Sequence, residues 1–114
     1  MTSLYLSIAL FALGAIVGMY LLSFVLQRKE TPKFVVFVHG VFVVVALILL
    51  ITYAQQSPGF TETIVIFVLA AVGGLVLVVR DLAKKPLPRW LALGHGMIAI
   101  IGFIFLLMNA FAGT

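Results

Sequence analysis

Apolar residues fill four long runs that are separated by three short polar connections. The runs cover residues 4–26, 34–54, 64–79 (continuing toward 82) and 90–112. None of them alternates apolar and polar residues as a half-buried or barrel strand would. A helix that crosses a hydrocarbon core of about 30 Å needs roughly 20 residues. The pattern therefore predicts four transmembrane helices, the third of them close to the lower limit of length.

Composition agrees with this pattern and narrows the class of protein. Of the 114 residues, 65% are hydrophobic and 9% are charged, whereas about 25% are charged in average soluble domains. A small soluble fold cannot hide so much apolar surface, which excludes a soluble enzyme, a nucleic-acid-binding domain and a disordered tail. The chain has no cysteine, so disulfide exchange, thiolate metal sites and thioether-linked haem are excluded as well.

The basic residues give the expected orientation. All seven lie in or beside the first and third connections: Arg28, Lys29, Lys33, Arg80, Lys84, Lys85 and Arg89. The positive-inside rule places both connections in the cytoplasm and both termini outside. The first run has no basic segment before it and no cleavage site after it, so we expect a retained helix rather than a signal peptide. We expect an integral protein of the lipid bilayer, typical of a bacterial inner membrane.

The chain also contains an internal duplication. Shifting the sequence by 56 residues gives 14 identities in 58 pairs without a gap. The matches include Gly18/Gly74, Lys29/Lys85, Pro32/Pro88 and His39-Gly40/His95-Gly96. Since each repeat holds two spans, both repeats enter the membrane from the same side. The predicted fold is all-α: one transmembrane domain over residues 1–114, a polytopic up-down-up-down four-helix bundle of two parallel two-helix repeats, 1–56 and 57–114.

Two histidines carry most of the chemical information. His39 and His95 are the only titratable residues well inside the apolar runs, and an ionisable side chain in a membrane marks function by default. Each follows a basic residue, Lys33 or Arg89, by six positions, which is about 9 Å along a helix. The duplication predicts that both histidines lie at one depth with one rotation. Glycines nearby are expected to leave volume beside the two rings.

A haem is one group that this volume would hold. Two imidazoles that reach inward across the bundle diagonal would each approach a central iron, and Lys33 and Arg89 would lie near the propionates. In this arrangement the chain resembles small four-helix b-type membrane cytochromes. The resemblance implies haem b as cofactor, His39 and His95 as its metal ligands, and electron transfer near the cytoplasmic face, with a quinone or a partner subunit.

Two other interpretations stay open at this level. The histidines could donate ring N–H groups to neighbouring helices or line a polar cavity, in a non-enzymatic accessory or assembly subunit that binds other membrane proteins. A metal or proton-relay role is the third interpretation. No carboxylate lies at the depth of the histidines, so neither a catalytic triad nor a closed zinc site can be built there.

Several smaller features give local predictions. Gly14 and Gly18 form a GxxxG motif, matched by Ala70 and Gly74, which predicts close helix packing, a homodimer seam or cofactor clearance. We expect the intramembrane hydroxyl groups to bond to carbonyls of their own helices; these belong to Ser7, Ser23 and Thr52. Asp81 is expected to form an interfacial ion pair with its neighbour Arg80.

Overall fold

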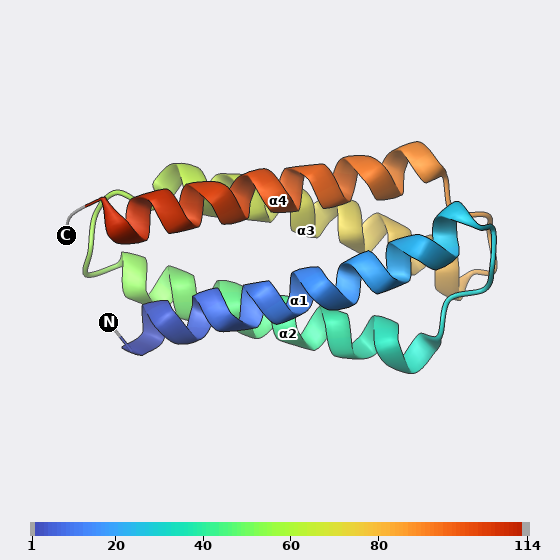
Figure 1. Ribbon diagram of the computed structural model, residues 1–114, viewed down its shortest axis with the longest axis horizontal. Coiled ribbons are helices and arrows are strands. Elements are labelled where there is room, and N and C mark those ends of the chain that lie inside the picture. Colours follow the sequence, from blue (N-terminus) through green and yellow to red (C-terminus); the bar gives the residue numbers. More distant parts are fainter. Residues whose placement is uncertain (1, 113–114) are drawn as a thin grey trace.

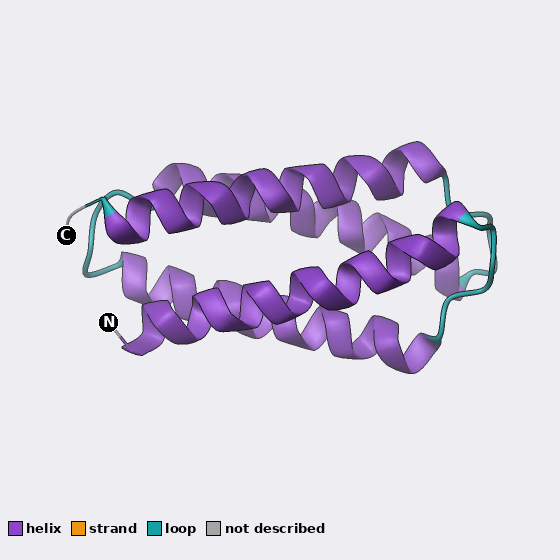
Figure 2. Cartoon of the chain, in the orientation of Figure 1, coloured by secondary structure: helices purple, strands orange, loops and turns teal. Residues whose placement is uncertain are grey.

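The computed structural model describes residues 2–112 and places four helices in this range (Figure 1). They are α1 (Thr2–Leu26), α2 (Lys33–Ala54), α3 (Thr61–Leu82) and α4 (Arg89–Phe111). Each is long and apolar enough to cross a membrane, and within residues 2–112 the rest is turn or loop (Figure 2). The predicted all-α class with four membrane-length helices is confirmed. Residues 1, 113 and 114, at the ends of the predicted repeats, lie outside the described residues.

The helices form two hairpins. Figure 1 shows consecutive helices running in opposite directions, so that the described chain starts and finishes at one end of the bundle. We call this the terminal end, and the opposite end, which holds residues 27–32 and 83–88, the basic end. Contacts are most extensive within the first hairpin (α1 and α2) and the second hairpin (α3 and α4). Between the hairpins, α1 contacts α4 more than α2 contacts α3.

Proline and a left-handed residue mark the helix boundaries at the basic end. Pro32 and Pro88 have extended backbone just before α2 and α4, one position earlier than the predicted first turn. Their carbonyl oxygens still accept the first helical hydrogen bonds, and their missing N–H groups would have no helical partner there. At the ends of α1 and α3, Arg28 and Lys84 have φ of 57° and 60°.

The apolar core lies in the terminal half of the bundle. Its large buried residues are Leu4, Phe11, Leu50, Phe60, Phe67 and Leu106. At the centre of this set the rings of Phe11 and Phe67 are stacked, with centroids 4.0 Å apart and planes 4° apart. The stack joins α1 to α3 across the bundle diagonal, and therefore links the two hairpins.

Two buried polar bonds cross between helices in the same half. Ser7 Oγ donates to the Ala46 carbonyl at 2.8 Å, and Asn109 Nδ2 donates to Thr63 Oγ1 at 2.7 Å. The prediction that Ser7 bonds within its own helix is therefore wrong. The same prediction is confirmed for Ser23 and Thr52, whose hydroxyl groups donate to Tyr20 and Ile48.

Buried positions recur along the chain with the spacing found in the sequence. Six pairs of buried residues are separated by 56 positions: Leu4/Phe60, Ser7/Thr63, Phe11/Phe67, Gly14/Ala70, Ala46/Gly102 and Leu50/Leu106. They include polar, aromatic and small residues, so the recurrence extends to the kind of side chain. Corresponding positions of the two hairpins thus occupy corresponding environments.

Candidate functional site

The two histidines are each tied to the other helix of their own hairpin. His39 on α2 directs Nδ1 to the Gly14 carbonyl of α1 at 2.9 Å, and His95 on α4 directs Nδ1 to the Ala70 carbonyl of α3 at 2.7 Å. A carbonyl oxygen only accepts, so in both rings Nδ1 carries the proton. In a neutral imidazole this leaves Nε2 as a lone-pair donor.

Small residues on α1 and α3 make room for these rings. A Cβ atom on Gly18 would lie 3.0 Å from His39 Cε1, and one on Gly74 would lie 2.9 Å from His95 Cε1. A Cβ on Gly14 would meet Val43 at 2.6 Å. The GxxxG motif therefore serves packing inside this chain, and the imidazoles fill the clearance that its glycines provide.

The two rings face each other across the interface between the hairpins. Their centroids are 6.3 Å apart, and their planes are 84° apart. Two collinear imidazoles on one metal ion, with N–metal bonds of about 2.0–2.1 Å, would have centroids about 6 Å apart. Within residues 2–112, neither Nε2 atom has a hydrogen-bond partner. The two lone pairs are thus available at a separation that suits a shared metal ion.

The pair stands alone as a set of metal-ligating side chains. Within the described range, no group of three or more His, Cys, Asp or Glu residues converges. A metal ion bound here would therefore have His39 and His95 as its protein ligands. Such a two-nitrogen set suits the axial positions of a haem iron and falls short of a closed tetrahedral site.

The predicted basic contacts of the site behave differently from each other. Lys33 Nζ forms an ion pair with Asp81 Oδ1 at 2.9 Å, and Thr31 Oγ1 donates to the second carboxylate oxygen. The expected Asp81–Arg80 pair is wrong, because the Arg80 guanidinium donates to the Pro86 carbonyl. Arg89 is exposed and makes no ion pair with any described residue.

The duplication explains this asymmetry. The position that corresponds to Asp81 in the first repeat is Val25, so Arg89 lacks the carboxylate that holds Lys33. Of the four predicted site residues, the structure brings His39 and His95 together and uses Lys33 to join α2 to α3. It leaves the Arg89 side chain free at the surface.

Sequence reasoning did not find the carbonyl acceptors of the histidines. Gly14 and Ala70 contribute backbone oxygen atoms, which no side-chain pattern reveals. One signal was present, because both acceptors precede their histidine by 25 residues. A small residue at this spacing in both repeats indicates where the partner helix approaches most closely.

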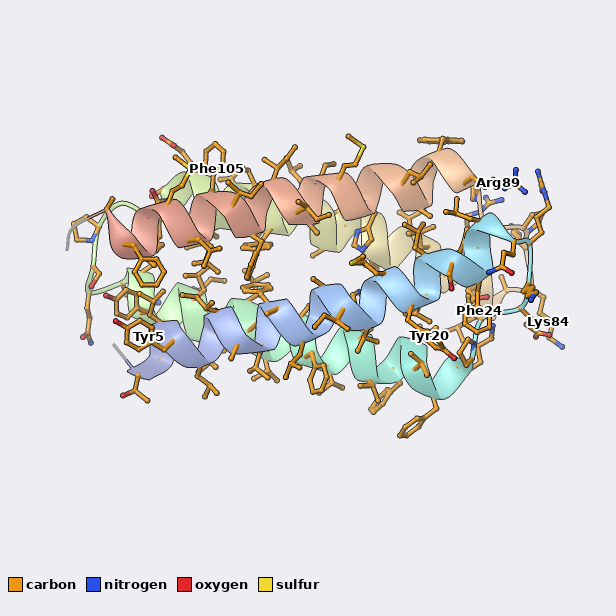
Figure 3. All side chains as sticks on the ribbon, viewed as in Figure 1. Tyr5, Tyr20, Phe24, Lys84, Arg89 and Phe105 are labelled. Atoms are coloured by element: carbon orange, nitrogen blue, oxygen red, sulfur yellow. The ribbon has the colours of Figure 1, made fainter. Side chains whose placement is uncertain are left out.

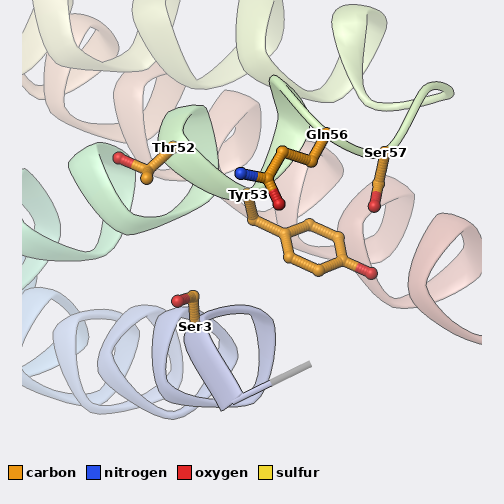
Figure 4. A pocket seen from close by; sticks show the side chains of 5 residues that line it. All are labelled: Ser3, Thr52, Tyr53, Gln56 and Ser57. Carbon is orange, nitrogen blue, oxygen red and sulfur yellow. The ribbon is translucent and has the colours of Figure 1, made fainter.

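The ends of the bundle carry recesses of different character. A recess of about 420 Å³ at the terminal end is lined by Ser3, Thr52, Tyr53, Gln56 and Ser57 (Figure 4). Charged residues dominate a larger recess at the basic end. Neither recess is lined by His39 or His95, so the histidine pair is a separate site in the bundle interior.

Comparison of the chain with protein-family models, curated proteins and solved structures finds no match. The functional argument therefore rests on the geometry of the histidine pair and on the chemistry of its surroundings.

Proposed function

We propose that this chain is an integral membrane electron-transfer protein that binds one b-type haem between His39 and His95. The arrangement of the two rings carries the proposal. Each Nδ1 is anchored to a backbone carbonyl, each Nε2 is unpartnered among the described residues, and the centroids are 6.3 Å apart. Metal-ligating histidines typically donate their second ring N–H in this way, which fixes the tautomer and the orientation of the ring.

The residues of the site fit the cofactor in donor set and in surroundings. When bound, a haem with two axial histidines supplies one-electron oxidation and reduction. The chain contributes the two nitrogen ligands, and the stacked Phe11 and Phe67 pack the interior next to the site on its terminal side. Both Nδ1 bonds lie within hairpins, so the interface between hairpins can widen around a ligand without breaking either bond.

The membrane placement belongs to the same proposal. Lys84 and Arg89 lie together at one end of the bundle in Figure 3, and the other basic residues belong to the same connections. The positive-inside rule supports a cytoplasmic position for this end and extracytoplasmic termini. The buried pairs at a spacing of 56 residues support two parallel repeats. Reporters fused at the carboxyl terminus and within residues 55–60 should both read as extracytoplasmic, and a cytoplasmic signal would contradict this orientation.

The spectrum of the purified protein tests the haem. Protein from haem-replete cells should show a Soret band that sharpens and shifts on reduction with dithionite, as six-coordinate haem does. A glutamine at position 39 can still donate to the Gly14 carbonyl but supplies no imidazole nitrogen. His39→Gln and His95→Gln should therefore each remove the six-coordinate spectrum while the helical circular dichroism persists.

A matched variant and two outcomes make this test decisive. Thr52→Ala removes a hydroxyl group that bonds only within α2, and it should leave the spectrum unchanged. A colourless wild-type protein would contradict the proposal. So would a His39→Gln variant with the wild-type spectrum, because an axial ligand cannot be replaced without a change in coordination.

The packing of the rings favours a second candidate function. Each imidazole fills the notch over Gly18 or Gly74 and bridges two helices of one hairpin. This is what a structural histidine would do in a non-enzymatic accessory or assembly subunit. In that case the protein would be colourless, both glutamine variants would keep wild-type stability, and the chain would co-purify with another membrane protein.

A further inference from the structure

The two basic connections enclose a recess of about 800 Å³ at the basic end of the bundle. The first connection contributes residues 28–31 and the third contributes residues 84–87. Apolar side chains at the helix ends complete the lining, among them Val25, Leu82 and Leu87. The recess therefore combines an apolar part next to the helices with a charged rim formed by the connections.

The charges of the recess are strongly unbalanced. Five basic and two acidic residues line it, a surplus of three positive charges. Asp81 is already held by Lys33 and Thr31, and Glu30 forms no ion pair with the described residues. No described residue forms a side-chain hydrogen bond or ion pair with the remaining four cations, which are Arg28, Lys29, Lys84 and Lys85. Four basic side chains are thus available to an anion.

The backbone places two of these cations in matching positions. Arg28 and Lys84 have φ of 57° and 60°, in the left-handed region where glycine is usual at helix ends. In both connections the next residue, Lys29 or Lys85, closes the helix through its N–H. The positions differ by 56 residues, so each hairpin presents a basic pair in the same geometry.

We propose that this recess binds the phosphate-bearing headgroup of an anionic phospholipid. Unpaired cations suit the phosphate, and the apolar helix ends suit the start of the acyl chains. Phe34 and Trp90, which are 77% and 74% exposed in the first turns of α2 and α4, fit the boundary between headgroups and hydrocarbon at this depth. The lipid site depends on the membrane placement proposed above and is independent of haem binding.

Native mass spectrometry of the detergent-solubilised protein tests the lipid directly. Phosphatidylglycerol and phosphatidylcholine with identical acyl chains are added in separate titrations. The wild type should retain one phosphatidylglycerol molecule with about tenfold preference over phosphatidylcholine, and each neutralised recess cation should lower this preference about fivefold. Lys84→Gln and Lys85→Gln are the test variants.

Arg89→Gln is the matched control, since it removes the same charge at the same end of the bundle but outside the recess. It should change the preference by less than about twofold. Equal retention of both lipids by the wild type would overturn the proposal, as would an equal effect of Lys84→Gln and Arg89→Gln. Displacement of the lipid by inorganic phosphate at low millimolar concentration would assign the recess to a soluble phosphate compound instead.

Discussion

The two halves of the bundle differ in how completely they are packed. In the terminal half, Leu4, Leu50 and Leu106 are no more than 1% exposed, and Phe11 stacks on Phe67. In the half toward the basic end, the buried apolar side chain is Ala92, and larger residues such as Leu22 are half-buried. Both halves use the same helices and the same apolar alphabet, so hydrophobicity alone does not decide where the core forms.

The difference separates stability from chemistry. The terminal half fixes the relative position of the hairpins through an aromatic stack and close-packed leucines. The other half holds the histidine pair, the unpaired cations and the larger recess. Because the hairpins are fastened at one end, the opposite end can accept a ligand without loss of the fold.

The largest effect is expected from the aromatic stack. Phe11→Ala should lower the free energy of unfolding by about 3 kcal/mol, at the low end of the range for Phe→Ala, because lipid rather than water solvates part of the released surface. Phe67→Ala should cost the same. Leu22→Ala, in the loosely packed half, should cost about 1 kcal/mol. Reversible unfolding in mixed micelles measures these values, and equal costs for Phe11→Ala and Leu22→Ala would abolish the comparison.

The notch over the histidine gives the next largest effect. Gly74→Ala places Cβ 2.9 Å from His95 Cε1, so the ring must move, and we expect a cost of about 2 kcal/mol. Gly18→Ala should behave alike. Gly40→Ala and Gly96→Ala meet nothing within 4 Å and should be neutral or slightly stabilising. Thermal melts followed by circular dichroism distinguish these outcomes, and a neutral Gly74→Ala would mean that the notch is not filled.

A pair of compensating residues offers a sharper test of the repeat. Gly14 faces Val43 in the first hairpin, whereas Ala70 and Ala99 occupy the corresponding positions of the second. Gly14→Ala alone should cost about 1.5 kcal/mol. Val43→Ala in the same chain should relieve at least about 1 kcal/mol of this cost. Strictly additive effects in the double-variant cycle would contradict equivalent packing of the two hairpins.

The smallest difference is expected between two serines. Ser7→Ala removes a bond between α1 and α2 and should cost about 0.6 kcal/mol, the average for hydrogen bonds between helices in membranes. Ser23→Ala removes a bond within α1 and should change stability by less than about 0.3 kcal/mol on the same scale. A larger loss for Ser23 would show that the basic half depends on polar contacts more than its packing indicates.

Much of the fold could be predicted because lipid imposes simple rules. Length and polarity alone define the four helices, and their observed bounds lie within three residues of the predicted ones except where α3 extends to Leu82. The meeting of His39 with His95 followed from the duplication, since equivalent residues of two similar hairpins lie at the same depth. Neither inference required knowledge of side-chain packing.

The polar contacts were harder to predict because they depend on helix rotation. Ser7 was expected to bond to its own helix, but the small Ala46 lets α2 come close enough to accept the bond. Asp81 was paired with its sequence neighbour Arg80, yet adjacent residues on a helix point about 100° apart. The carboxylate instead reaches Lys33 at the start of α2.

The confinement of each histidine bond to one hairpin has a consequence for biogenesis. Residues 2–54 contain every group needed to lock α1 onto α2. At roughly 5–20 residues per second of synthesis, the first hairpin is complete in the membrane several seconds before the last residue of the second is added. The histidine pair is therefore assembled from two preformed halves, in the order of translation. Two separately translated hairpins should still find each other through the aromatic stack.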